Sequence, residues 1–151
     1  PPQVINQVAG ILESSSAPMA TLAEPIESVE DLLDPNIVKV VTAENGDALY
    51  FSRAPIPWPR DAFTDTRDVM PVGGNWYRHI GLYAYRVGFL HQFVNWPPAP
   101  EEHLESLEQL RALHNGVGIH VDRAVHTVPA GVDTHDDLVL VRTVLKGKRE
   151  S

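Results

Sequence analysis

The residues best suited to do chemistry lie in one short stretch, residues 78–86, with the sequence RHIGLYAYR. In a β-strand, successive side chains point to opposite faces. One face would carry Ile80, Leu82 and Ala84, and the other His79, Gly81, Tyr83 and Tyr85. The second face combines a titratable ring, two phenols and a position without a side chain, so it could admit a polar ligand. The simpler interpretation is that these side chains pack under a loop and satisfy one another, because many strands have one half-solvated polar face.

A second candidate is Arg53, which follows a predicted β-hairpin. The β-branched run 37–41 and the apolar run 48–52 flank an Asn-Gly-Asp sequence at 45–47, a strong turn signal because Asn and Gly tolerate positive φ. The hairpin would deliver Arg53 to the start of the segment 55–59, whose alternating prolines hold the backbone extended. Arg53 would then stand at the mouth of a rigid loop, either as a ligand contact or as an ordinary solvated arginine.

A third group of candidates lies in a predicted helix from Glu101 to about His114, which the Asn-Gly pair at 115–116 would end. The buried side of this helix would hold Leu104, Leu107, Leu110 and Leu113, and the opposite side Glu105, Glu108 and Gln109. Carboxylates and amides suit sugar hydroxyl groups, since each accepts hydrogen bonds and an amide also donates them. The alternative is a solvated acidic face without a ligand.

A fourth candidate, Asp133, precedes the last predicted helix, from Thr134 to Leu145. The sequence Thr-His-Asp-Asp at 134–137 matches the Ser/Thr-x-x-Asp/Glu pattern of a helix N-terminus. If Thr134 caps the helix, the Asp133 carboxylate is free for another task. If Asp133 is itself the cap, it has a structural role only.

The elements that would position these residues alternate between helix and strand, which indicates an α/β fold with one antiparallel hairpin. The predicted helices beyond those above cover 1–12, 28–33 and 87–96, and the other predicted strands cover 19–26 and 119–127. The stretch 60–77 has the composition of a turn and is expected to be a mobile or partner-contacting loop.

Four stretches taken in order carry a resemblance to a known family. They are residues 51–58 (FSRAPIPW), 78–86 (RHIGLYAYR), 105–111 (ESLEQLR) and 129–134 (PAGVDT). Together they closely resemble the 3-deoxy-manno-octulosonate (Kdo) cytidylyltransferases, the bacterial CMP-Kdo synthetases, and the resemblance runs from the first residues to about Leu140. It implies a Rossmann-like nucleotidyltransferase fold with a mixed sheet. It also implies that the N-terminal nucleotide-binding part of that fold is missing, so that 1–151 is a single-domain fragment from the C-terminal portion, which provides sugar binding and dimerisation.

The resemblance also implies a reaction and roles for particular residues. CTP and Kdo would give CMP-Kdo and pyrophosphate for lipopolysaccharide synthesis, with Mg²⁺ as the cofactor and a homodimer as the active form. The implied substrate-binding residues are Arg53, His79, Tyr83, Glu108 and Gln109, and Asp133 would be a catalytic, magnesium-binding aspartate. A second aspartate, in a loop that the family places before residue 1, would complete the metal site, so the fragment alone is expected to be inactive.

Composition excludes several other classes. The chain has 151 residues, enough for one domain with a core. It carries 20 acidic and 12 basic side chains, a balance that argues against binding nucleic acid or an anionic membrane. It has no cysteine, no apolar run as long as the roughly 20 residues of a membrane span and no His-x-x-x-His pair, so disulfides, a spanning helix and a zinc site are not expected. A cytoplasmic location is expected.

Two alternative functions remain open at the level of sequence. One is a related cytidylyltransferase that acts on another acidic sugar, such as 8-amino-Kdo or a sialic acid. The other is a sugar-binding or dimerisation module without catalysis of its own.

Overall fold

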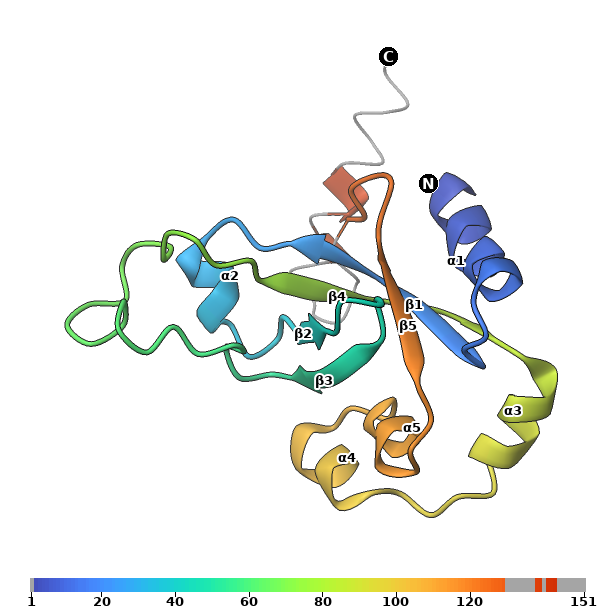
Figure 1. The fold of residues 1–151 in the computed structure, drawn as a ribbon. Helices are drawn as coiled ribbons and strands as arrows, with labels where there is room; N and C mark the ends of the chain where they lie inside the picture. Colours follow the sequence, from blue (N-terminus) through green and yellow to red (C-terminus); the bar gives the residue numbers. More distant parts are fainter. Residues whose placement is uncertain (1, 130–137, 140, 144–151) are drawn as a thin grey trace.

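The fold is built on one mixed, five-stranded sheet (Figure 1). The computed structural model describes residues 2–129, 138–139 and 141–143. The strands are β1 (Met19–Pro25), β2 (Lys39–Thr42), β3 (Ala48–Ser52), β4 (Tyr77–Tyr85) and β5 (Ile119–Arg123), in the order β3-β2-β4-β1-β5. β1 and β5 run parallel and the other neighbours antiparallel, so the predicted α/β class, mixed sheet and hairpin are confirmed.

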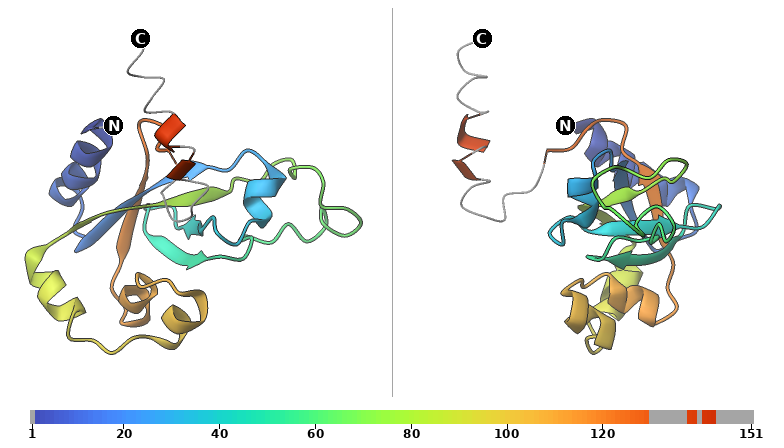
Figure 2. Two further views of the ribbon diagram at one scale, coloured as in Figure 1. Left: turned by 180° about the vertical axis from the view of Figure 1, so that it is seen from behind. Right: turned by 90° about the vertical axis from the view of Figure 1, so that its left-hand side faces the viewer.

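Helices lie on both sides of the sheet (Figures 1 and 2). They are α1 (Pro2–Ser14), α2 (Val29–Leu33), α3 (Val87–Phe93), α4 (Pro100–Glu105) and α5 (Leu110–His114). Among the described residues, no helix is long and apolar enough to cross a membrane.

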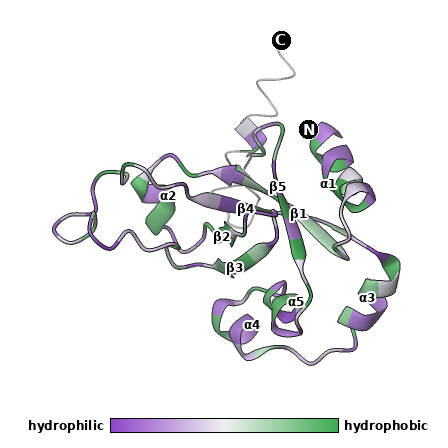
Figure 3. Cartoon of the chain, in the orientation of Figure 1, coloured by the Kyte–Doolittle hydropathy of each residue, from purple (hydrophilic) through white to green (hydrophobic). Residues whose placement is uncertain are grey.

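The helix α1 covers one face of the sheet because its apolar residues recur at helical spacing. Val4, Val8 and Ile11 are buried and form one core with Leu22 of β1 and Ile80 of β4. The rest of α1 faces outward, and Figure 3 shows hydrophilic and hydrophobic residues side by side along it. The apolar face predicted for β4 is therefore confirmed.

The opposite face of the sheet holds a larger core, which α3 and α5 cover. Its centre includes Phe51 from β3, Ile119 from β5 and Leu110 from α5, all nearly without solvent contact. The side chains of Tyr83 and Tyr85 pack against this core. The two tyrosines of the candidate face of β4 are therefore partly buried against the main core.

The hairpin β2–β3 curls across the sheet until its tip meets the opposite outer strand. Asp47 forms an antiparallel bridge with His120, and the Val121 N–H donates to the Gly46 carbonyl oxygen at 2.9 Å. A Cβ on Gly46 would lie 2.7 Å from Cε1 of His120, and the φ of Gly46 is 87°, so only glycine fits this turn. The two edge strands of the sheet thus approach one another around the main core.

The strand β4 contains a bulge at its glycine. Its partner β1 pairs Thr21 with Tyr83 and the next residue, Leu22, with Ile80, so Gly81 and Leu82 are additional residues on β4. Because two residues are inserted, the alternation of side chains between the two faces is preserved. Gly81 is exposed, and a Cβ there would meet nothing within 4 Å.

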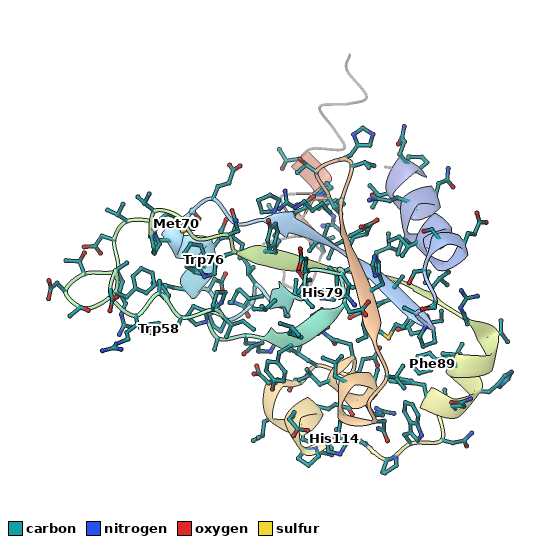
Figure 4. The ribbon with its side chains drawn as sticks, in the orientation of Figure 1. Trp58, Met70, Trp76, His79, Phe89 and His114 are labelled. Carbon is teal, nitrogen blue, oxygen red and sulfur yellow. The ribbon has the colours of Figure 1, made fainter. Side chains whose placement is uncertain are left out.

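The loop between β3 and β4 is packed against α2, although its composition suggested a mobile or partner-contacting loop. Phe63 and Trp76 are 5% and 4% exposed and form a third core with Leu32. The indole N–H of Trp76 donates to the Pro57 carbonyl oxygen at 2.7 Å. Figure 4 shows Met70 beside Trp76 in this part of the molecule. Two aromatic side chains therefore anchor this loop, while residues 64–69 and 72–75 are exposed, so a mobile or partner-contacting loop stays a prediction.

The prediction of one continuous helix from Glu101 to His114 is wrong. The chain forms α4 and α5 with a break between them, where Ser106 adopts the left-handed conformation with φ 53°. As a result, Leu104 is 87% exposed, while Leu107 and Leu110 enter the main core. The leucines are evenly spaced in the sequence, but the break prevents them from forming one helical face.

Candidate functional site

His79 lies near the centre of the molecule, where it is half-buried beside the main core (Figure 4). Its ring packs edge-on against Phe51, with 5.0 Å between the ring centroids. Burial lowers the pKa of His79 to about 4, so the imidazole is neutral at pH 7. A neutral imidazole has one donor nitrogen and one acceptor nitrogen, and its neighbours decide which is which.

Thr21 decides the tautomer of His79. The hydroxyl Oγ1 of Thr21 lies 3.0 Å from Nε2 of His79, and also 3.0 Å and 2.9 Å from the carbonyl oxygens of Ile80 and Leu82. A hydroxyl has a single hydrogen, and carbonyl oxygens accept only, so Thr21 donates to the carbonyls and accepts from His79. Nε2 therefore carries the proton. Nδ1 is an acceptor without a partner among the residues that the structure describes.

The tyrosines continue a row of aromatic rings from His79. The centroid of Tyr83 is 5.2 Å from that of His79 and 5.7 Å from that of Tyr85, which in turn stacks on Phe89. Burial, followed by the nearby Tyr85 and the Glu108 carboxylate, raises the pKa of Tyr83. Tyr83 therefore stays protonated at all physiological pH values and offers a hydroxyl donor and acceptor.

Arg53 is held from two sides. Its backbone N–H donates to Oε2 of Glu105 at 2.9 Å, and its Nε–H donates to the Glu105 carbonyl oxygen at 2.6 Å. On the other side, Nη1 donates to the carbonyl oxygen of Pro35 at 3.0 Å. The second carboxylate oxygen of Glu105 accepts the hydroxyl of Ser52 at 2.6 Å. The arginine is thus a fixed, half-buried group rather than a freely solvated one.

Lys39 supports the turn behind Arg53. The side chain is fully buried, and Nζ donates to the carbonyl oxygens of Asp34 at 2.8 Å and Ile37 at 2.5 Å. Burial lowers the pKa of Lys39, and the nearby Asp34 carboxylate opposes this shift. Since Pro35 lies between the two carbonyls that Lys39 binds, the lysine also fixes the carbonyl oxygen that receives Arg53.

Glu108 and Gln109 do not share one helix face with Glu105, as the sequence suggested. They lie in the break between α4 and α5, where Glu108 is exposed and Gln109 is only 4% exposed. Glu108 stands close enough to Tyr83 and Tyr85 to raise the pKa of both phenols, although burial is the larger cause for each. The break, rather than a helical face, brings Glu108 toward the aromatic row.

The predicted residues therefore fall into two neighbouring groups. His79, Tyr83 and Glu108 lie along the aromatic row, whereas Arg53 stands beside the end of α4. Phe51 links the groups, because it contacts His79 and precedes Arg53 by two positions in the chain. Two contributors, Thr21 and Glu105, were not predicted. The available signal for Thr21 was a single hydroxyl within the apolar strand MATLAEP, and Glu105 was seen only as part of an acidic face.

Asp133 lies outside the described residues. Within the described part of the chain, no cluster of three histidine, aspartate or glutamate side chains could hold a metal ion.

A separate cavity of about 470 Å³ lies beneath the hairpin tip. Its floor includes Ala23, Val40 and Val121, and its rim carries Glu44 and the Arg123 side chain, whose guanidinium lies 4.8 Å from the ring centroid of Tyr77. None of the predicted site residues that the structure describes lines this cavity.

Comparison with known proteins relates the chain to cytidylyltransferases. Residues 1–120 match a protein-family model described as cytidylyltransferase. Proteins named 3-deoxy-manno-octulosonate cytidylyltransferase from Alcanivorax borkumensis and Pseudomonas syringae pv. syringae are 58% and 59% identical over 98% and 97% of this chain. A solved structure described as CMP:2-keto-3-deoxy-manno-octonic acid synthetase complexed with CTP superimposes with a TM-score of 0.81, at 36% identity over 97% of this chain.

The chain spans only part of these relatives. It covers 59% and 58% of the two relatives named above and 57% of the solved structure.

Proposed function

Because the chain belongs to the cytidylyltransferase family, we propose that the protein containing it activates Kdo with CTP, giving CMP-Kdo and pyrophosphate. The observation that carries this proposal is the identity of 58% to 59%, across nearly the whole chain, to proteins named for that reaction. A related solved protein was described in complex with CTP, which supports CTP as the nucleotide. Free CTP would make the cytoplasm the place of reaction.

In this proposal the described residues hold the sugar. Kdo is a polyhydroxy acid, and a guanidinium is a strong partner for a carboxylate, so Arg53 binds the sugar carboxylate. Nδ1 of the neutral His79 accepts a hydrogen bond from a sugar hydroxyl, and the phenol of Tyr83 either donates or accepts one. Glu108 and Gln109 take further hydroxyl groups. Fixing the sugar in one orientation supplies the proximity contribution to the rate.

The chemical step is a substitution at phosphorus. The anomeric hydroxyl oxygen of Kdo forms a bond to the α-phosphorus of CTP, the bond from that phosphorus to the β-phosphate oxygen breaks, and pyrophosphate leaves. The hydroxyl proton passes to solvent or to a base outside the described residues. Bound magnesium would supply neutralisation of the phosphate charges, and Asp133 would be one of its carboxylate ligands.

The same proposal includes a homodimer. Trp58 is 46% exposed at the start of the long loop that extends away from the strands, and Leu49 and Tyr50 are 61% and 36% exposed on the hairpin (Figure 1). Exposed aromatic residues are enriched at interfaces. Trp76, near the end of the stretch 60–77 that was expected to be a mobile or partner-contacting loop, is buried and does not contribute.

The decisive experiment is a substrate panel on the intact protein. Kdo, 8-amino-Kdo and a sialic acid are each supplied with CTP, and pyrophosphate release is measured. The proposal expects the highest kcat/KM with Kdo. A higher value with another acidic sugar assigns the protein to that sugar. Binding of Kdo without any pyrophosphate release indicates a sugar-binding module and refutes the proposed reaction.

A further inference from the structure

We infer that Glu105 is the positioning residue of Arg53: it sets the direction from which the guanidinium meets a carboxylate, without touching the substrate. The inference rests on the proposed function, in which Arg53 binds the carboxylate of an acidic sugar. Glu105 stands at the end of α4, 52 positions from Arg53 in the chain. The contact between them is therefore a tertiary one, formed only when α4 is docked beside β3.

The three oxygen atoms of Glu105 accept hydrogen bonds from two adjacent residues. Oε1 accepts the hydroxyl of Ser52, Oε2 accepts the backbone N–H of Arg53, and the main-chain carbonyl oxygen accepts the Nε–H of Arg53. The distances are 2.6 Å, 2.9 Å and 2.6 Å. Backbone and side chain of Arg53 are thus fixed by the same residue, so a shift of Glu105 would move the guanidinium as a unit.

The break in the chain after Glu105 makes this arrangement possible. Ser106 adopts φ 53°, which ends α4 and lets the main-chain carbonyl of Glu105 accept a bond from a side chain. In an uninterrupted helix that carbonyl would accept the N–H four residues later. The left-handed conformation of Ser106 therefore affects Arg53, which is distant in the chain and directly follows β3.

The geometry also selects how a carboxylate can approach. A carboxylate that docks side-on uses Nε–H together with one Nη group of the guanidinium. Here Nε–H is already donated to the Glu105 carbonyl. A bound carboxylate must therefore meet the outer Nη edge of Arg53, where Nη1 gives one of its two hydrogens to the Pro35 carbonyl, and this contact fixes the orientation of the whole sugar.

The test is steady-state kinetics of Glu105→Gln in the intact protein. The substitution keeps the main-chain carbonyl that accepts the Arg53 Nε–H but weakens the side-chain bonds to the Ser52 hydroxyl and the Arg53 backbone N–H. The end of α4, and with it that carbonyl, would then shift and misplace the guanidinium, so the KM for Kdo is expected to rise about tenfold while the KM for CTP stays within about twofold. In an Arg53→Lys background the same substitution should add less than about twofold, because lysine has no Nε–H or planar fork to orient. Glu101→Gln is the matched control, since Glu101 is on the same helix and bonds His114.

Two results would overturn the inference. One is an equal rise of both KM values in Glu105→Gln, which is the signature of a general structural role. The other is a tenfold rise that persists in the Arg53→Lys background. If Glu105→Gln does not fold, Ser52→Ala removes the contact to Oε1 together with the acceptor of the Ala54 N–H, and an unchanged KM for Kdo in that variant overturns the inference equally.

A second readout separates the inference from the proposed function. The order parameter of the Arg53 Nε–H bond, measured by ¹⁵N relaxation, is expected to fall in Glu105→Gln and to stay unchanged in Glu101→Gln. A wild-type protein without Kdo turnover whose Arg53 still loosens in Glu105→Gln refutes the reaction and keeps the positioning role. An Arg53 that is equally rigid in both variants refutes the positioning role.

Discussion

Thr21 and His79 are joined by a hydrogen bond of 3.0 Å between Oγ1 and Nε2, at a point where the threonine is fully buried. The two residues belong to neighbouring strands, β1 and β4. Because the hydroxyl hydrogen is taken by main-chain carbonyls, the bond places the imidazole proton on Nε2. A residue with no expected chemistry thus determines which nitrogen of His79 faces a ligand as an acceptor.

Replacing Thr21 by valine is expected to let His79 populate both of its neutral tautomers. The ring ¹⁵N chemical shifts of His79 should change from a pure Nε2–H pattern to a mixture, and the KM for Kdo in the intact protein should rise about fivefold, the effect of one neutral hydrogen bond. Thr64→Val, at an exposed position, is the control and should change neither quantity. A His79 spectrum that is unaltered in Thr21→Val would show that other groups hold the tautomer.

His79 should make the folded state sensitive to acid. Its pKa is about 4 in the folded protein and near 6.5 when unfolded, so between these values the unfolded state binds a proton that the folded state does not. This contribution to stability is full above pH 6.5 and is lost as the pH falls toward 4, by about 3 kcal/mol at most.

Urea unfolding across this range, with wild type and His79→Gln compared, measures the effect. The glutamine variant is expected to lose less stability than wild type between pH 6.5 and 4. His103→Gln, at an exposed site, should keep the wild-type dependence. If the free energy of unfolding changes with pH in the same way for wild type and His79→Gln, the result would contradict the lowered pKa of His79.

Lys39→Met should destabilise the protein by about 2 kcal/mol or more, because it leaves two main-chain carbonyls without their donor. The pKa of Lys39 is lowered by burial, so the unfolded state binds the proton more tightly. The stability that wild-type Lys39 contributes should therefore grow as the pH rises toward 10.5. Urea unfolding at pH 7 and pH 10 measures both effects, with Arg60→Met as a solvent-exposed control.

Asp133→Asn in the intact protein should lower kcat by about a hundredfold or more, since the substitution keeps the size of the side chain and removes the charge that would hold magnesium. The 151-residue chain alone should show neither activity nor tight magnesium binding, because one carboxylate is too few. Isothermal titration with magnesium and a pyrophosphate assay test both statements. Near-normal turnover of Asp133→Asn would place the metal site elsewhere.

Trp58→Ala should weaken the proposed homodimer, because it removes the largest exposed aromatic side chain of the long loop. Sedimentation at micromolar concentration is expected to show a dimer for wild type and a shift toward monomer for the variant. Leu104→Ala serves as the control, since Leu104 is 87% exposed on the separate helix α4. A wild-type protein that is entirely monomeric at that concentration would contradict the proposal.

Local patterns were enough to predict most elements of the fold. The spacing of Val4, Val8 and Ile11 identified α1, and the Asn-Gly turn identified the hairpin, because both signals depend on residues close together in the chain. The two faces of β4 were predicted for the same reason. The bulge at Gly81 keeps them intact, because it inserts two residues.

The incorrect predictions concern contacts between distant segments. The leucine spacing continues through the break between α4 and α5, and the contacts that accompany the break are visible only in three dimensions: Glu105 is held by Ser52 of β3 and by Arg53. Likewise, the composition of the long loop gave no sign that Trp76 packs with α2. The site residues were suggested by resemblance, but the roles of Thr21 and Glu105 required the structure.

The contact between the hairpin tip and β5 has a consequence for the order of folding. Asp47 and His120 are 73 positions apart, so their bridge closes a long loop, whereas the hairpin itself needs only residues 39–52. Closing a long loop costs more entropy, and contacts of large sequence separation slow the rate-limiting step. The hairpin can therefore form early, while its docking on β5 must wait until the chain between them has collapsed. Gly46, the residue that admits His120, acts on a late event, so its substitution would accelerate unfolding more than it slows folding.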